Sequence, residues 1–220
     1  MWYKFIRGLC KLFSLVFFRY RASGQDNIPT DGAFLLVSNH QSFLDPIFCA
    51  IAIKRPLHFL ARDSLFRNWF FGRAIRSVNA IPVSRGKADI ATMKKIISIL
   101  KQGRGVCLFP EGTRCEDGRI RPFKPGLGLL CRRGNAAIVP VVIEGAFECW
   151  PRHKKIFRPG AVINIRYDKP ITFEQVKNMT NEELAELLTT RLRTMQNEIR
   201  LELGKEPLDY EENMEMFDAG

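Results

Sequence analysis

The sequence is short of paired cysteines. No C-x-x-C motif occurs among the six cysteines, which are scattered along the chain: Cys10, Cys49, Cys107, Cys115, Cys131 and Cys149. This pattern is typical of free thiols in a reducing compartment, and it argues against a disulfide framework or a cysteine-based zinc site. We therefore expect no bound metal and no cofactor.

Long hydrophobic runs, internal repeats and low-complexity segments are also missing. No stretch reaches the ~18 uncharged apolar residues expected of a membrane-spanning helix. With 220 residues and 46% hydrophobic content, the chain fits one globular domain with a substantial core.

The N-terminal segment lacks acidic residues, and the C-terminal segment lacks basic residues. Residues 1–21 carry five bases and no acid, residues 206–220 carry six acids and no base, and the formal net charge is +11. Such a charge implies a partner with a negative surface: anionic lipid, nucleic acid or a phosphorylated substrate. No nucleic-acid-binding motif is legible, so we expect no nucleic acid partner.

Residues 2–20 are predicted to form an amphipathic helix that lies on a membrane, within an anchoring unit of residues 1–24. At 100° per residue Lys4, Arg7 and Lys11 share an arc with Ser14. The opposite side carries large apolar residues: Trp2, Phe5, Ile6, Leu9, Leu12, Phe13, Val16, Phe17 and Tyr20. A basic stripe beside aromatics suits an interfacial helix whose bases meet anionic headgroups. A secretory signal and an ordinary core-packing helix remain alternatives.

The body, residues 25–205, alternates short apolar runs with amphipathic stretches. Predicted strands are 33–38, 57–61, 79–83, 105–109, 137–143 and 161–167. Predicted helices are 46–53, 66–76, 87–101 and 124–133, followed by a long helix that begins at a capping box of Thr180 and Glu183. The fold class is therefore α/β, a mostly parallel or mixed sheet covered by helices, with ligands gathering at the carboxyl ends of the strands. The acidic tail, residues 206–220, is predicted to be solvated and mobile.

A histidine and an aspartate lie five residues apart in the connection between the first predicted strand and the helix that follows it. His40 and Asp45 belong to the stretch Ser38-Asn39-His40-Gln41-Ser42-Phe43-Leu44-Asp45. An imidazole titrates close enough to neutrality to act as a general base, while the plain alternative is a loop histidine beside a helix cap. Five helical residues turn by 500°, so His40 should precede the helix and Asp45 should lie in its first turn. Either Ser42 caps this helix or Asp45 does, with Pro46 at the first position.

Cationic residues follow other predicted strands. Arg85 follows the strand 79–83, and Arg114 ends the segment Phe109-Pro110-Glu111-Gly112-Thr113-Arg114; Lys124 comes shortly after. Guanidinium groups, an ammonium and a helix N-terminus at one sheet edge are suited to holding a phosphate monoester. Pro140 in the apolar run 137–143 predicts an edge strand or a bulge.

These blocks together resemble a known family. Asn39-His40-Gln41-Ser42-Phe43-Leu44-Asp45 resembles the H-x-x-x-x-D motif of the glycerolipid acyltransferases, with the 1-acyl-glycerol-3-phosphate (lysophosphatidate) acyltransferases as the closest group. Ile81–Gly86, Phe109–Arg114 and Ile138–Ile143 resemble the second, third and fourth blocks, in order, over roughly residues 30–145. Ser84 stands where the second block commonly carries an acid.

The resemblance implies transfer of a fatty acyl group from acyl-CoA or acyl-carrier protein to the free hydroxyl of 1-acyl-glycerol-3-phosphate, giving phosphatidate. His40 would take the hydroxyl proton and Asp45 would hold the ring. Arg85 and Arg114 would bind the acceptor phosphate with Lys124, while Thr113 and the turn at Glu111 and Gly112 would contribute hydrogen bonds. No covalent acyl-enzyme is expected.

The implied setting is the cytoplasmic face of the inner or plasma membrane, on a surface with anionic lipid. Two alternatives stay open. In the first, the enzyme acylates another lysophospholipid or a lyso-aminolipid. In the second, the chain binds lipid without catalysing a reaction.

Overall fold

A seven-stranded sheet with helices on both faces forms the protein. The computed structural model describes residues 1–83 and 90–210. The strands are β1 (Arg19–Ser23), β2 (Ala33–Ser38), β3 (Leu57–Arg62), β4 (Ala80–Val83), β5 (Gly105–Leu108), β6 (Ala136–Glu144) and β7 (Val162–Tyr167). They lie in the order β1-β7-β6-β2-β5-β3-β4, and every neighbouring pair is parallel except the antiparallel pair β6 and β7. The expected α/β class is confirmed.

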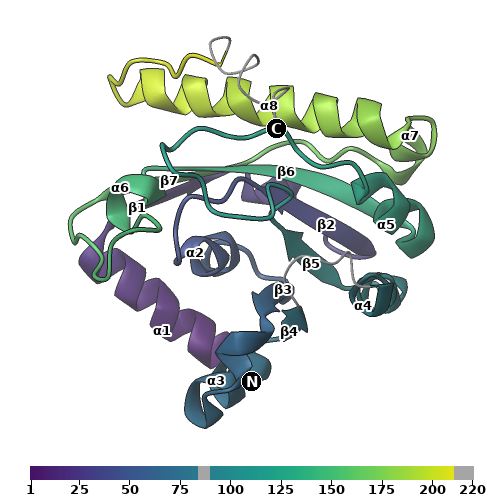
Figure 1. Ribbon diagram of the computed structural model, residues 1–220, viewed down its shortest axis with the longest axis horizontal. Coiled ribbons are helices and arrows are strands. Elements are labelled where there is room, and N and C mark those ends of the chain that lie inside the picture. Colours follow the sequence, from purple (N-terminus) through teal and green to yellow (C-terminus); the bar gives the residue numbers. More distant parts are fainter. Residues whose placement is uncertain (84–89, 211–220) are drawn as a thin grey trace.

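Eight α-helices and two short 3₁₀ segments connect the strands in the described part of the chain. They are α1 (Trp2–Phe17), η1 (Gln25–Asn27), α2 (Asp45–Ile51), η2 (Asp63–Phe66), α3 (Trp69–Ser77), α4 (Ile90–Lys101), α5 (Leu127–Gly134), α6 (Ala146–Cys149), α7 (Phe173–Lys177) and α8 (Asn181–Glu202). Figure 1 shows α8 along one side of the sheet, with α1 and α2 on the other.

The alternation of residues along β2 builds two separate cores. Phe34 and Leu36 pack into a cluster with residues of α2, whereas Leu35 and Val37 pack into a cluster with residues of α4, α5 and α8. Successive side chains of a strand point to opposite faces, so a strand covered on both faces is apolar throughout.

The N-terminal helix is shorter than predicted. Its predicted last residues, 19 and 20, instead belong to β1, whose residues Arg19–Ser23 pair in parallel with β7. The predicted anchoring unit therefore contributes an edge strand to the sheet. Alternating exposure along a short edge strand gives a weak sequence signal next to a strongly periodic helix.

Pro140 predicts an edge strand or a bulge, and the edge strand is wrong because β6 is an inner strand between β2 and β7. The β6–β7 ladder begins at Val141, and the Pro140 carbonyl accepts a bond from the N–H of Asp168, just past the end of β7. Pro140 thus stands where the regular ladder has stopped, so its missing N–H costs no strand pairing.

Two other predicted helices are altered by local signals. The predicted helix 66–76 is split into η2 and α3, since the Asn68 side chain accepts a bond of 2.9 Å from the N–H of Phe71 and caps a new helix. The predicted helix 124–133 begins only at Leu127, after Pro125. Residues 87–89 of the predicted helix 87–101 lie outside the described residues.

The long C-terminal helix begins as predicted. The Thr180 hydroxyl accepts from the N–H of Glu183, and the Glu183 carboxylate accepts from the N–H of Thr180. The start of the predicted mobile tail is held against this helix: the Leu208 N–H donates to Asn197, and the Tyr210 hydroxyl bonds Gln196. The rest of the tail, from residue 211, lies outside the described residues.

Candidate active site

His40 and Asp45 meet at the carboxyl end of β2. The Nδ1 atom of His40 lies 2.7 Å from Oδ2 of Asp45. His40 stands in the non-helical connection after β2, and Asp45 is the first residue of α2. The geometric argument from the spacing is thereby confirmed: the chain turns back before the helix begins, and this lets the carboxylate reach the ring.

The helix cap matches neither prediction as stated. Leu44 occupies the N-cap position and makes no side-chain cap bond. The Ser42 hydroxyl accepts from the N–H of Leu44 at 3.3 Å. Asp45 Oδ2 accepts from the N–H of Gln41 at 2.6 Å and of Ser42 at 2.7 Å, reaching back as the acidic residue of a capping box does. A wholly buried carboxylate held by two backbone donors is fixed in place for the ring.

Two buried amide side chains lock the same connection. The Asn39 side chain donates to the carbonyl of Ile143 and accepts from its N–H, at 2.9 and 2.8 Å. The Gln41 side chain donates to the carbonyl of Gly118 and accepts from the N–H of Phe147. These two positioning residues were missed from the sequence. Their signal was the unbroken run of polar residues 38–42 at the end of an apolar strand, a place where polar side chains are buried only when they are hydrogen-bonded.

The backbone of His40 is bound to the loop that follows β5. Its N–H donates to Glu111 Oε1 at 2.7 Å, and its carbonyl accepts from the N–H of Cys115 at 2.8 Å. The ring stacks on Phe109, with centroids 4.3 Å apart and planes at 22°. The adjacency of β2 and β5 brings together two segments 71 residues apart in the chain.

Glu111 is buried and fully engaged. Its second oxygen, Oε2, accepts from the N–H of Arg121 at 3.2 Å. Burial raises the pKa of the Glu111 carboxyl to about 8, against the smaller lowering effect of the two backbone hydrogen bonds. Because both oxygens accept from backbone donors, the Glu111 side chain holds the loop after β5 against the backbone of His40.

The remainder of this loop presents Gly112, Thr113 and Arg114. Gly112 has φ of +71°, the left-handed region that favours glycine in a tight turn. The Arg114 guanidinium carbon lies 3.4 Å from the centroid of the Phe43 ring, a cation–π contact with the connection that carries His40. The Thr113 hydroxyl lies 3.5 Å from Nη1 of Arg152. Arg152 was missed because it follows no strand end.

Of the two other predicted cations, Lys124 lies within the described residues and Arg85 lies outside them. Lys124 is exposed, three residues before the start of α5. Of the predicted cations, the structure brings Arg114 to the connection that carries His40.

The cysteines near the site are buried thiols. Burial raises the pKa of Cys115 to about 12, and it also raises the pKa of Cys107. A thiol with a raised pKa is a poor nucleophile because the thiolate is the reactive form.

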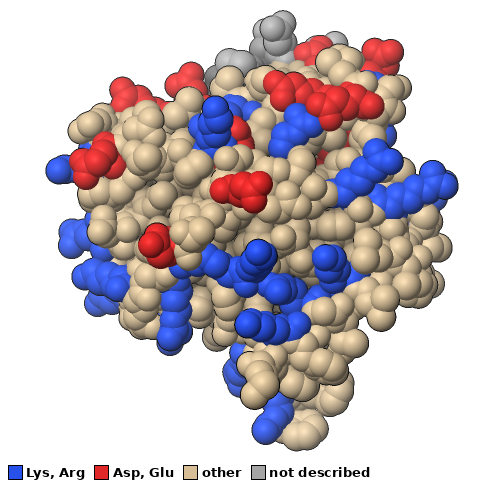
Figure 2. Space-filling view, turned by 180° about the vertical axis from the view of Figure 1, so that it is seen from behind, with Lys and Arg blue, Asp and Glu red and all other residues tan. Residues whose placement is uncertain are grey.

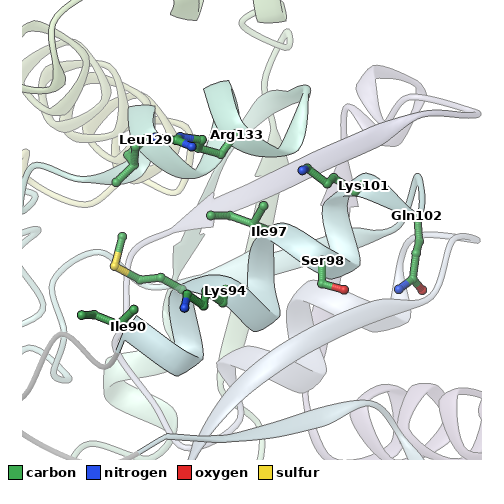
Figure 3. Close-up of a pocket in the computed structure, with 9 residues that line it drawn as sticks. Ile90, Lys94, Ile97, Ser98, Lys101, Gln102, Leu129 and Arg133 are labelled. Atoms are coloured by element: carbon green, nitrogen blue, oxygen red, sulfur yellow. The ribbon is translucent and has the colours of Figure 1, made fainter.

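A separate groove lies between α4 and α5, away from these residues. Its volume is about 700 Å³, and it is lined by Lys94, Ile97 and Lys101 of α4 and by Leu129 and Arg133 of α5 (Figure 3). Among the predicted site residues that the structure describes, none lines this groove. Within residues 1–83 and 90–210, no group of three or more His, Cys, Asp or Glu side chains is arranged to hold a metal ion.

The fold and this site define a class: an α/β protein with a partly exposed histidine paired to a buried aspartate at the carboxyl edge of a largely parallel sheet. The sequence model of the acyltransferase family matches residues 19–144. The chain belongs to this acyltransferase family.

Relatives of the chain carry a common name. The chain is 28% identical over 186 residues to a chloroplast 1-acyl-sn-glycerol-3-phosphate acyltransferase of Arabidopsis thaliana, covering 81% of this chain and 52% of the relative. It is 25% identical over 202 residues to the 1-acyl-sn-glycerol-3-phosphate acyltransferase of Bacillus subtilis, covering 90% of this chain and 98% of the relative. The chain thus spans about half the length of the plant relative and nearly all of the bacterial one.

A solved structure shares the fold. The crystal structure of the 1-acyl-sn-glycerophosphate acyltransferase from Thermotoga maritima superposes with a TM-score of 0.79 at 26% identity, covering 90% of this chain and 79% of that chain.

Proposed function

We propose that this protein transfers a fatty acyl group from a thioester donor to the free hydroxyl of 1-acyl-glycerol-3-phosphate, giving phosphatidate for phospholipid biosynthesis. The observation that carries the proposal is the His40–Asp45 pair, held at 2.7 Å beside an arginine-bearing loop. The names of the relatives support the acceptor, and the positive charge of the chain suits its phosphate.

In this mechanism His40 is the general base. Its Nδ1 is taken by the Asp45 carboxylate, so this nitrogen carries the proton and Nε2 presents the lone pair. Nε2 takes the proton of the acceptor hydroxyl as the oxygen attacks the thioester carbonyl. The carbon–sulfur bond then breaks, and the imidazolium returns the proton to the leaving thiolate. Asp45 stabilises the imidazolium between these steps.

Transfer is direct, without an acyl group on the protein. The cysteine close to His40, Cys115, is buried with a raised pKa, and Ser42 bonds the backbone rather than a base. An acyl adduct on a side chain, trapped and located by mass spectrometry, would contradict this proposal.

Acceptor recognition is assigned mainly to Arg114. A guanidinium binds a phosphate with paired hydrogen bonds, and the Phe43 ring orients its plane. Thr113 adds a hydrogen bond from the same loop, whereas the N–H of Gly112, also predicted to contribute, already donates to the carbonyl of Phe109 at 3.0 Å. Arg85 and Lys124 stay as proposed further contacts with the phosphate. Glu111, first predicted to bind substrate, is reassigned as a positioning residue for the backbone of His40.

We also propose that α1 holds the protein on the cytoplasmic face of the inner or plasma membrane, at anionic lipid. No helix in the described residues is long and apolar enough to cross a membrane. The helix is turned so that Arg7 bonds the carbonyls of Ile53 and Lys54 and Ser14 is buried against the body. Its outer face exposes large apolar residues by 49–67%: Trp2, Phe5, Leu9, Leu12, Leu15 and Val16.

This orientation distinguishes the proposal from the core-packing alternative. A core-packing helix buries its apolar side, whereas α1 turns Arg7 and Ser14 to the protein together with Cys10 and Phe13, and leaves most of its large apolar side chains exposed. It also changes one detail: Arg7, predicted to meet headgroups, is used inside the protein, and Lys4 and Lys11 stay exposed beside the apolar face.

An assay of purified protein in detergent tests the reaction. Labelled lysophosphatidate is offered with a panel of acyl-CoA and acyl-carrier-protein donors, and other lysophospholipids and a lyso-aminolipid are offered as competing acceptors. Formation of labelled phosphatidate, lost in His40→Ala, is the expected result. Turnover of another acceptor alone would overturn the acceptor, and no turnover with any pair would favour a lipid-binding protein.

A further inference from the structure

A second surface element packs beside β4, the edge strand at the end of the sheet away from β1. It is the segment of η2 and α3, residues 63–77, which we call the α3 projection. Its first helical residues are strongly exposed aromatics: Trp69 by 76%, Phe70 by 76% and Phe71 by 47%. Leu65, just before them, is exposed by 42%. Exposed apolar patches of this kind mark an interaction site.

Three arginines surround a pocket on the same projection. The pocket has a volume of about 390 Å³ and is lined by Phe66, Arg67, Trp69, Arg73 and Arg76. Trp69, Arg73 and Arg76 share one side of the helix, at positions i, i+4 and i+7. The Arg76 guanidinium carbon lies 5.0 Å from the centroid of the Phe66 ring, which holds this cation at the wall of the pocket.

Specific packing and capping contacts hold the α3 projection in a defined conformation. At Gly72 a Cβ atom would lie 2.7 Å from the carbonyl oxygen of Phe66, so only glycine lets α3 pack this closely on η2. The Asn68 side chain caps the helix. An isolated helix of nine residues is marginal in water, and these two devices fix its aromatic and basic sides relative to each other.

The position of the projection matches that of the N-terminal helix. In Figure 1 α3 lies at the lower end of the molecule, beside the N-terminus and the start of α1, and α8 lies at the opposite end. In the view from behind, the lower part of the molecule shows Lys and Arg but no Asp or Glu, while acidic residues gather in the upper part (Figure 2).

We infer that the α3 projection is a second membrane-binding element, with Trp69 and Phe70 entering the apolar layer and the Arg67, Arg73 and Arg76 pocket holding the phosphate of an anionic phospholipid headgroup. Aromatics beside arginines are the pattern of an interfacial element, and guanidinium groups bind phosphate with paired hydrogen bonds. The inference rests on the proposed membrane association, and it adds a lipid class and a second attachment point that fixes how the protein is oriented on the membrane.

Vesicle sedimentation of the full chain tests the exposed aromatic residues and the arginine pocket of the α3 projection separately. Vesicles are made of phosphatidylcholine alone or with added phosphatidylglycerol. The double variant Trp69→Ser/Phe70→Ser should weaken binding to both, by roughly tenfold per aromatic. The double variant Arg73→Gln/Arg76→Gln should weaken binding by about fivefold per arginine, and only when phosphatidylglycerol is present.

Matched controls lie at the far side of the molecule. Leu201→Ser removes an apolar side chain exposed by 61% on α8, and Lys169→Gln/Lys177→Gln removes the same charge from exposed positions near α7. Both should bind vesicles as the unchanged protein does. If the α3 variants also bind unchanged, the inference is wrong and the patch serves a protein partner, while attachment by α1 stands.

A fluorescence measurement tests directly whether Trp69 enters the lipid layer, without changing any residue of the α3 projection. The protein has three tryptophans, and Trp2→Phe/Trp150→Phe leaves Trp69 as the sole emitter. Vesicles with brominated acyl chains should quench this emission, and its spectrum should shift to the blue. Vesicle-bound protein whose Trp69 is not quenched would overturn the inference alone. Failure of the unchanged protein to bind any vesicle would overturn the proposed membrane association as well.

Discussion

The backbone N–H of His40 donates a 2.7 Å hydrogen bond to Oε1 of Glu111, a residue 71 positions later in the chain. The bond runs from the connection after β2 to the loop after β5, so the proposed base is held by its main chain as well as by its ring. This separation of backbone and ring contacts allows the two functions of His40 to be tested apart.

Replacing His40 should remove turnover and leave the fold intact. In His40→Ala the main-chain bonds to Glu111 and Cys115 remain, because neither uses the ring. We expect phosphatidate formation to fall by at least ~10²–10⁴-fold, the usual contribution of a general base. Thermal unfolding should stay close to that of the unchanged protein. His153→Ala is the control, since His153 is exposed, and near-normal activity in His40→Ala would refute the assignment.

Asp45→Asn tests the electrostatic role of the carboxylate. The amide oxygen can still accept from the N–H groups of Gln41 and Ser42, so the loop should keep its shape. The negative charge that stabilises the imidazolium is lost, and we expect kcat to fall by roughly 10²–10⁴-fold. The measurement is kcat together with a thermal unfolding curve. A variant that unfolds without losing activity per folded molecule would show a purely structural aspartate.

The buried Glu111 carboxyl predicts a pH dependence of stability. Below its ordinary pKa of 4.5 the group is protonated in both states; between 4.5 and about 8 the unfolded chain releases the proton and the folded protein keeps it. The free energy of unfolding contributed by Glu111 should therefore fall as pH rises through this window, by at most ~1.4 kcal/mol per pH unit. Urea unfolding from about pH 5 to about pH 8 should show a shallower decline in Glu111→Gln than in the unchanged protein. Parallel curves would refute the raised pKa.

Arg114→Ala should act on acceptor binding. Loss of a hydrogen bond to a charged group costs about 1.5–3 kcal/mol, so we expect KM for lysophosphatidate to rise roughly 10- to 100-fold with kcat much less changed. Arg119→Ala is the matched control, since Arg119 pairs with Asp117 on the same loop at 3.5 Å. An equal fall in kcat and kcat/KM would instead place Arg114 in the transition state, and unfolding would make its role structural.

Asn39→Ala should destabilise the fold. The Asn39 side chain satisfies both the N–H and the carbonyl of Ile143 inside the protein. Leaving two buried backbone groups unpaired should lower the free energy of unfolding by about 2–4 kcal/mol. Denaturant unfolding measures this, with Asn68→Ala, a loss of one exposed cap bond, as a milder comparison at about 1 kcal/mol. A smaller effect for Asn39 than for Asn68 would contradict the prediction.

Much of the architecture follows from local pattern. Apolar runs bounded by turn residues located β2 to β7, and the Thr180–Glu183 box located the start of α8, because strand alternation, helical periodicity and capping act over a few residues. β1 was not predicted, because its five residues alternate in exposure at a sheet edge and directly follow a strongly periodic helix.

The relation of His40 to Asp45 was also within reach of the sequence. Five residues from a strand end to a helix start constrain the backbone enough to predict that His40 precedes the helix, and the structure agrees.

Only the tertiary structure decided what surrounds that pair and which way α1 faces. The adjacency of β2 and β5 brings Glu111 beneath His40 and Arg114 onto Phe43, and strand order depends on nonlocal packing that no local pattern encodes. The same holds for Arg7: the sequence places it on the polar side of α1, and the packing of α1 on α2 turns Arg7 and Ser14 toward the body and leaves most of the large apolar side chains exposed. The sequence determined the chemical groups and their local geometry; long-range packing determined their neighbours.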